Sequence, residues 1–150
     1  MTRVLFVCLG NICRSPTAEG VFRARAAAAD MAVTVDSAGT GAWHVGEAPD
    51  HRAQNEAQRR GYDLSHQRAR QVTAQDFRDF DLIFAMDRSN LANLRRVRPA
   101  NATAEVELFL DLLPDQPLRE VPDPYYEDGF DMVLDLIEDG ADALIARLSA

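Results

Sequence analysis

Short apolar runs alternate with helical patterns along the whole chain. Four runs are typical of buried strands, at residues 4–8, 33–36, 81–86 and 105–109. The stretches between and after them repeat apolar residues every three or four positions, as helices packed on one face do. This alternation predicts βαβ units. We therefore expect an α/β fold, a doubly wound four-stranded parallel sheet with helices on both faces.

The ends of several predicted helices carry their own signals. Ser15 is placed to cap a helix that runs to about residue 29, and Pro16 suits the first turn of that helix. A second helix is expected to stop at Gly61, and a third covers residues 89–97. The last helix is strongly amphipathic, with Gly140 as a weak point. Its predicted core face consists of Phe130, Val133, Leu134, Ile137, Ala141, Leu144, Ile145 and Leu148.

The segment between the first strand and the first helix combines a thiol, a tight loop and an arginine. Cys8 ends the strand, five residues follow, and Arg14 and Ser15 open the helix. Such a loop can turn its backbone N–H groups toward one centre, where the helix dipole adds positive potential. That potential favours the thiolate, which is the reactive form of cysteine. The spacing predicts a phosphate-binding loop in which Cys8 is a nucleophile and Arg14 grips two phosphoryl oxygens.

Other polar residues are expected at the same edge of the sheet. In an open α/β sheet, ligands bind beyond the carboxyl ends of the strands. Cys8, Ser37, Asp87 and the segment after Phe109 each follow a predicted strand. The sequence therefore predicts a single site built around the first loop.

A stiff acidic loop precedes the last helix. Pro122 and Pro124 fix Asp123 in an extended segment, directly before Tyr125 and Tyr126. Attack of a thiolate on a phosphomonoester needs a proton donor for the leaving oxygen, and Asp123 is the candidate acid. The aromatic rings suit a flat aryl leaving group.

The sequence allows two interpretations of Trp43 and two of Cys13. Trp43 either walls the site or fills the core. Cys13 either packs under the loop or acts as a resolving thiol that captures oxidised Cys8.

Composition narrows the class of protein. The chain of 150 residues is expected to form a single domain over residues 1–150, and its net charge of −8 argues against nucleic acid or an anionic membrane as a partner. No stretch is long or apolar enough to span a membrane, so we expect a cytoplasmic protein. The two cysteines lie in one loop, and no Cys or His pair has the spacing of metal ligands. We expect no metal and no cofactor.

Several motifs together resemble the low-molecular-weight protein tyrosine phosphatases. The resemblance covers nearly the whole chain in order, and the late DPYY motif makes it specific. The motifs are CLGNICRS at 8–15, DSAGT at 36–40, WHVG at 43–46, ARQV at 69–72, AMD at 85–87 and DPYY at 123–126.

The resemblance implies a role for each matching residue. Cys8 would form a phosphocysteine, Arg14 would bind the phosphoryl group, and Asp123 would protonate the tyrosyl oxygen and then activate water. Ser15 would hydrogen-bond the Cys8 sulfur, and Asn11 and Ser37 would brace the loop. The substrate, a phosphotyrosine protein or peptide, would lie against the loop, which also takes inorganic phosphate or a similar oxyanion. The residues of the substrate site would be Leu9, Gly10, Asn11, Ile12, Cys13, Trp43, Tyr125 and Tyr126.

One position departs from the family pattern. The family usually has a histidine three residues before the arginine that matches Arg70, whereas this chain has Gln67 there and His66 one residue earlier. Either Gln67 takes the supporting role or the turn shifts by one residue.

Four alternative functions share parts of this pattern. A protein arginine phosphatase would use the same loop, but the apolar Ile12 favours an aryl phosphate over a guanidinium phosphate. A phosphocysteine phosphocarrier would need no acid, and a non-catalytic phosphotyrosine reader would need neither Cys8 nor Asp123. Thiol-relay arsenate reductases would need further cysteines, which this chain lacks after Cys13.

Overall fold

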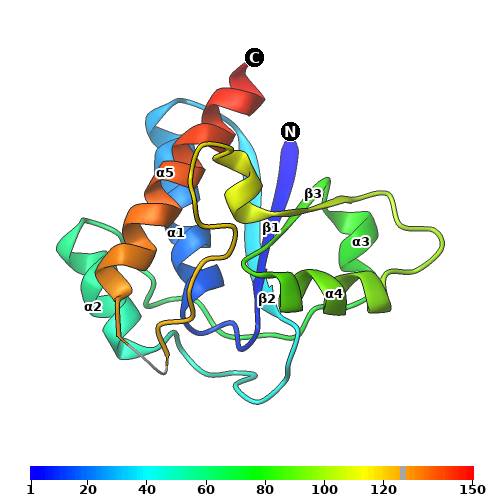
Figure 1. Ribbon diagram of the computed structural model, residues 1–150, viewed down its shortest axis with the longest axis horizontal. Helices are drawn as coiled ribbons and strands as arrows, with labels where there is room; N and C mark the ends of the chain where they lie inside the picture. The colour runs from blue at the N-terminus through cyan, green and yellow to red at the C-terminus, as the bar shows by residue number, and fades with distance from the viewer. Residues whose placement is uncertain (126–127) are drawn as a thin grey trace.

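The computed structural model describes residues 1–125 and 128–150, and it contains a four-stranded parallel sheet (Figure 1). The strand order is β2-β1-β3-β4, so the chain winds outward from β1 in both directions. This confirms the predicted doubly wound α/β fold. The strands are β1 (Thr2–Cys8), β2 (Val33–Gly39), β3 (Leu82–Ala85) and β4 (Glu105–Leu108).

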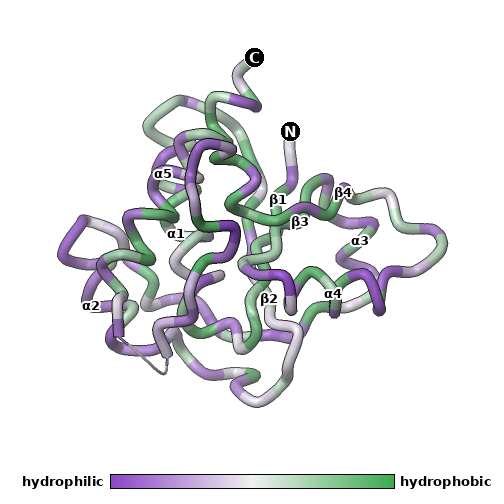
Figure 2. The backbone as a smooth tube through the Cα atoms, in the orientation of Figure 1, coloured by the Kyte–Doolittle hydropathy of each residue, from purple (hydrophilic) through white to green (hydrophobic). Residues whose placement is uncertain are grey.

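Helices cover both faces of the sheet. Alternate residues of β1 point to opposite sides, so Val4 and Phe6 pack with α1 (Arg14–Ala28) and α5 (Phe130–Ser149). Leu5 and Val7 pack instead with α3 (Asp76–Asp79) and α4 (Arg88–Val97). Helix α2 (His51–Arg59) lies beside α5, and a 3-10 turn, η1 (Phe109–Leu112), follows β4. Figure 2 shows hydrophobic residues along the central strands and more hydrophilic ones along the outer segments.

Aromatic rings fill the core between the sheet and α1. Phe6 stacks on Phe84 at 5.9 Å between ring centroids, and Phe22 and Phe109 meet Phe6 edge-on at 5.8 and 5.9 Å. All four rings are fully buried. They hold β1 in the core at Phe6, and the first loop follows at the carboxyl end of this strand. Within residues 1–125 and 128–150, no helix has the length and apolarity to cross a membrane.

Strand β2 is longer than the sequence pattern predicts. The expected break at Ser37 is wrong, because parallel pairing with β1 continues through Ala38 to Gly39, which lies opposite Cys8. A Cβ on Gly39 would lie 2.8 Å from the carbonyl oxygen of Leu9, so glycine lets the loop after β1 pack directly on β2. The extended pairing thus places Ser37 beneath the loop.

Gly140 is a packing position, which corrects its interpretation as a weak point of the last helix. A Cβ built there would lie 2.3 Å from Cζ of the buried Phe109 ring. Without the side chain, α5 and η1 can touch.

We expect Gly140→Ala to destabilise the protein although alanine is the better helix former. Forcing a methyl group against Phe109 should cost about 1–3 kcal/mol of unfolding free energy, because a packed core relaxes little. Urea unfolding measures the change, and Asp139→Ala, at an exposed position on the same helix, is the control. Equal or higher stability of Gly140→Ala would contradict this account of the contact.

Candidate active site

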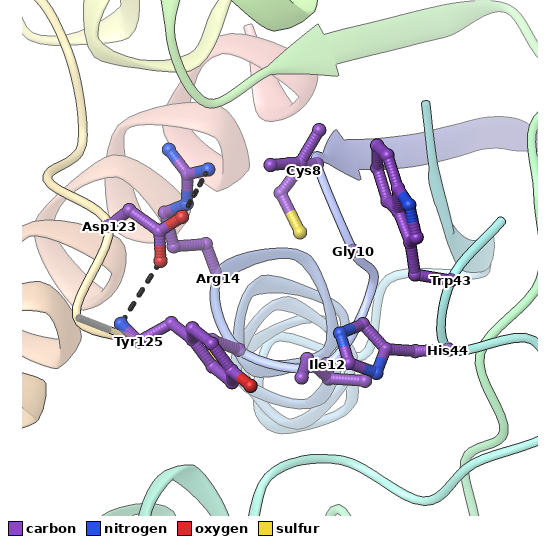
Figure 3. Close-up of a pocket in the computed structure, with 10 residues that line it drawn as sticks. Cys8, Gly10, Ile12, Arg14, Trp43, His44, Asp123 and Tyr125 are labelled. Atoms are coloured by element: carbon purple, nitrogen blue, oxygen red, sulfur yellow. Dashed lines mark hydrogen bonds and ion pairs between the residues drawn. The ribbon is translucent and has the colours of Figure 1, made fainter. Parts of the chain in front are cut away.

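The loop of residues 9–13 joins β1 to α1 and wraps around the Cys8 sulfur. Asn11 adopts a left-handed backbone conformation with φ of 58°, which asparagine tolerates better than most residues. Its backbone N–H points at Cys8 and lies 3.3 Å from Sγ. In Figure 3 the Cys8 sulfur faces the centre of the pocket.

The Asn11 side chain holds this conformation from inside the protein. Its amide nitrogen donates to Ser15 Oγ at 2.8 Å and to Ser37 Oγ at 2.9 Å. Its amide oxygen accepts the backbone N–H of Arg70 at 3.0 Å. The structure therefore brings Asn11, Ser15 and Ser37 together under the loop, with all three buried.

Ser15 serves the thiol rather than the helix end, so its prediction as the helix cap is wrong. Helix α1 has Cys13 as its N-cap, and the Cys13 side chain makes no capping hydrogen bond. Ser15 Oγ lies 3.0 Å from Cys8 Sγ. Ser15 Oγ accepts a hydrogen bond from Asn11, and its single hydroxyl proton can go to the sulfur or to the carbonyl oxygen of Ala38, 3.4 Å away.

Two further residues support the site: Glu19, which carries no signal in the sequence, and Arg70, which stands out there only as part of the ARQV motif. Glu19 is buried on α1 and accepts a hydrogen bond from Ser37 Oγ at 2.7 Å, although in sequence it looks like an ordinary helix residue four positions before Arg23. Arg70 binds Asp36 and Asp76 through its guanidinium at 3.0 and 2.9 Å. Through these contacts, Arg70 links the loop that follows α2 to β2 on one side and to α3 on the other.

Gln67 and His66, the two residues at the position that departs from the family pattern, differ in burial and in their contacts. Gln67 is buried and donates to the carbonyl oxygen of Pro16 at 2.9 Å, in the first turn of α1. His66 is exposed. Gln67 is thus the one that packs against the first turn of α1, while Glu19 is the residue that contacts Ser37.

Arg14 lies at the start of α1 with its guanidinium held by three partners. Nη1 donates to Asp87 at 2.6 Å and to the carbonyl oxygen of Val121 at 3.0 Å, and Nη2 lies 3.4 Å from Asp123. Burial alone would lower the pKa of Arg14, but neighbouring Cys8, Asp87 and Asp123 raise it above its usual value. Arg14 is therefore a fixed cation at the pocket wall.

Asp123 is the acidic group at the mouth of the pocket. One carboxylate oxygen faces Arg14, and the other accepts the backbone N–H of Tyr125 at 3.1 Å (Figure 3). Tyr125 packs against Arg52, whose guanidinium lies 5.7 Å from the ring centroid. Tyr126 falls outside the described residues.

The pocket itself has a volume of about 320 Å³. Trp43 stands on the side opposite Asp123 and is 72% exposed, so it walls the pocket and does not fill the core (Figure 3). A Cβ on Gly41 would lie 1.9 Å from the Trp43 ring, so glycine lets the indole rest on the backbone. The lining residues are Cys8, Leu9, Gly10, Ile12, Cys13, Arg14, Trp43, His44, Asp123 and Tyr125.

Cys13 lines the same pocket and is a free, buried thiol like Cys8. Burial, with the nearby charges of Asp50, Cys8 and Asp123, raises the pKa of Cys13 far above its usual range. Cys13 therefore stays protonated at neutral pH. Its role as a resolving thiol stays a prediction.

The geometry suits covalent transfer of a phosphoryl group. A sulfur nucleophile, a fixed guanidinium and a carboxylate border one small cavity, and the backbone N–H of Asn11 points at the sulfur. In the described part of the chain, no three His, Cys, Asp or Glu side chains gather in a way that could hold a metal ion.

Comparison with known proteins assigns this architecture to a family. The family model described as low molecular weight phosphotyrosine protein phosphatase matches residues 3–150. The chain belongs to this family. The expected resemblance is thereby confirmed, and the match includes the loop, the Trp43 segment and the Asp123 segment.

Similar proteins occur in both bacteria and eukaryotes. The low molecular weight protein-tyrosine-phosphatase YfkJ of Bacillus subtilis is 44% identical over 150 residues, which cover 99% of this chain and 96% of that protein. Its crystal structure superposes with a TM-score of 0.95 over 99% of this chain and 95% of that chain. A Schizosaccharomyces pombe low molecular weight phosphotyrosine protein phosphatase is 47% identical, with 91% of this chain and 90% of that protein covered.

One structural neighbour is described by a different activity. The crystal structure of a Drosophila arginine phosphatase is 32% identical to this chain and has a TM-score of 0.94, covering 100% of this chain and 99% of that one. Fold alone therefore does not separate the two phosphatase classes, and the choice depends on the pocket lining.

Proposed function

We propose that this protein hydrolyses phosphotyrosine in proteins, and small aryl phosphate monoesters, through a phosphocysteine intermediate. The observation that carries the proposal is the convergence of three groups on one cavity of about 320 Å³. Cys8 supplies the nucleophile at its floor, Arg14 the phosphate clamp, and Asp123 the acid at its mouth.

In the first step, Cys8 Sγ attacks phosphorus and the bond from phosphorus to the tyrosyl oxygen breaks. Asp123, protonated for this step, gives its proton to the leaving oxygen, so that tyrosine departs neutral. Arg14 and the loop N–H groups bind the equatorial oxygens, whose charge they stabilise in the transition state. The Arg14 cation is already oriented by Asp87 and Val121, so little reorganisation is needed.

In the second step, water attacks the phosphocysteine. The Asp123 carboxylate takes a proton from that water, the bond from sulfur to phosphorus breaks, and inorganic phosphate leaves. Ser15 stabilises the departing Cys8 sulfur through its hydroxyl, which lies 3.0 Å from Sγ. Asn11 and Ser37 keep the loop in shape through both steps.

The pocket lining favours an aryl phosphate. Trp43 and Tyr125 offer flat faces on two sides, and Ile12 adds an apolar contact between Tyr125 and His44. A guanidinium leaving group would lose hydration beside Ile12 without gaining a hydrogen-bond partner from it. Phosphotyrosine therefore fits this lining better than phosphoarginine.

A substrate panel tests the proposal. Purified protein is assayed, with and without chelator, on p-nitrophenyl phosphate and on peptides that carry phosphotyrosine, phosphoserine or phosphoarginine. We expect the two aryl substrates to be preferred and chelator to leave their hydrolysis unchanged. Faster hydrolysis of the phosphoarginine peptide would instead place this chain with the arginine phosphatases.

We also propose a cellular compartment and partners for the enzyme. We place it in the cytoplasm as a single domain over residues 1–150, acting on phosphoproteins and holding inorganic phosphate as product in the loop. The net charge of −8 disfavours nucleic acid and anionic membranes as general partners.

A further inference from the structure

A second, smaller cavity lies next to the catalytic pocket. Its volume is about 190 Å³, and Leu9 and Trp43 line both cavities, so these two residues form the partition between them. Helix α4 supplies the far wall. The residues that matter here are Leu9, Trp43, Val72, Asn93, Arg96 and Val97.

Helix α4 and the residues that follow it form the most basic segment of this acidic protein. Residues 88–104 contain four arginines and no acidic residue, while the whole chain has a net charge of −8. Among the described residues, Arg88, Arg95, Arg96 and Arg98 form no ion pair, whereas most other arginines lie within 4.0 Å of a carboxylate. These four side chains are exposed, so their charge is available to a partner.

Arg96 directs this charge toward the second cavity. It is the one charged residue among those described that line the cavity, and its guanidinium is held by Asn93 Oδ1 at 3.0 Å. Trp43 and Val97 add exposed apolar surface beside it. An occupant would therefore combine an apolar stem with a negative charge, as a glutamate or aspartate side chain does.

We propose that this cavity is a subsite for an acidic residue that flanks the phosphotyrosine of the substrate. The proposal rests on the proposed function, because it needs a phosphotyrosine in the catalytic pocket. With the ring held between Trp43 and Tyr125, the neighbouring peptide passes over Trp43, and its carboxylate meets Arg96. Arg95 and Arg98, one and two positions away on the chain, add attraction for acidic sequences.

Peptide kinetics test this subsite. Phosphotyrosine peptides of equal length, with glutamate, alanine or lysine on both sides, are compared with p-nitrophenyl phosphate, which is too small to reach Arg96. We expect the wild type to prefer the glutamate peptide over the alanine peptide in kcat/KM by about three- to tenfold, and rising salt to reduce that preference. Arg96→Glu should abolish the preference and leave p-nitrophenyl phosphate hydrolysis unchanged, while Arg96→Lys should retain part of it.

Arg78→Glu is the matched control, because it makes the same change in net charge at an exposed position on α3 outside both cavities. Absence of a preference in the wild type, or an equal loss in Arg78→Glu, would overturn the subsite. Binding of phosphatidylserine vesicles that depends on Arg96, without any peptide preference, would overturn it in favour of a lipid surface. A wild type inactive on every substrate would instead overturn the proposed function.

Discussion

Replacing Cys8 by serine is expected to abolish turnover while leaving the fold and phosphate binding intact. Removing a covalent nucleophile costs on the order of 10⁶-fold in kcat in another hydrolase, and a similar loss is expected here. The serine hydroxyl offers no accessible anion near neutral pH, whereas Arg14 and the loop N–H groups still bind phosphate. Steady-state assays on p-nitrophenyl phosphate and titration with inorganic phosphate measure the two properties separately.

Cys13→Ser is the matched control for this substitution. It makes the same sulfur-to-oxygen exchange five residues later in the same loop, at a thiol that stays protonated at neutral pH. We expect Cys13→Ser to keep turnover. Substantial activity of Cys8→Ser would remove Cys8 from the role of nucleophile.

Asp123→Asn is expected to slow hydrolysis most for substrates whose leaving group is strongly basic and must be protonated as it departs. For phenyl phosphate, kcat/KM should fall by about 10²- to 10⁴-fold, the usual contribution of general acid catalysis. For p-nitrophenyl phosphate the fall should be much smaller, because nitrophenolate is stable as an anion. Since kcat/KM reports the steps up to formation of the phosphoenzyme, comparison of the two substrates isolates proton donation.

The control for Asp123→Asn is Glu120→Gln, which exchanges a carboxylate for an amide three residues earlier and outside the catalytic pocket. It should leave both substrates unaffected. If Asp123→Asn lowered kcat/KM equally on phenyl phosphate and p-nitrophenyl phosphate, Asp123 would act through the Arg14 ion pair and not as the acid.

The fold and the location of the site follow from local sequence patterns. The four apolar runs predict the strands. Cys8 ends β1, Ser37 lies two residues before the end of β2, and Asp87 follows β3, so all three lie toward one edge of the sheet. Alternation of strands and helices determines this convergence, because parallel strands share an edge. Nothing beyond spacing and residue type is needed for that step.

Some partners of the site residues could not be predicted, because they are remote in sequence and chemically ordinary. Asp87 binds Arg14 across 73 residues, and Glu19 contacts Ser37 from the middle of a helix. Serine at a helix start usually caps the helix, but Ser15 contacts the sulfur of Cys8 instead, as the family resemblance implies. Gly140 could not be recognised as a packing position, because helix propensity takes no account of Phe109 on a neighbouring element.

Trapping the intermediate tests the central claim most directly. The wild-type enzyme is mixed with a phosphotyrosine peptide, quenched in acid within the first turnover, digested and analysed by mass spectrometry. We expect the peptide that contains Cys8 to carry the mass of one phosphoryl group, with fragment ions placing it on Cys8 and none on Cys13. Release of tyrosine with no phosphoryl group on the enzyme, or a phosphoryl group on another residue, would contradict the phosphocysteine mechanism.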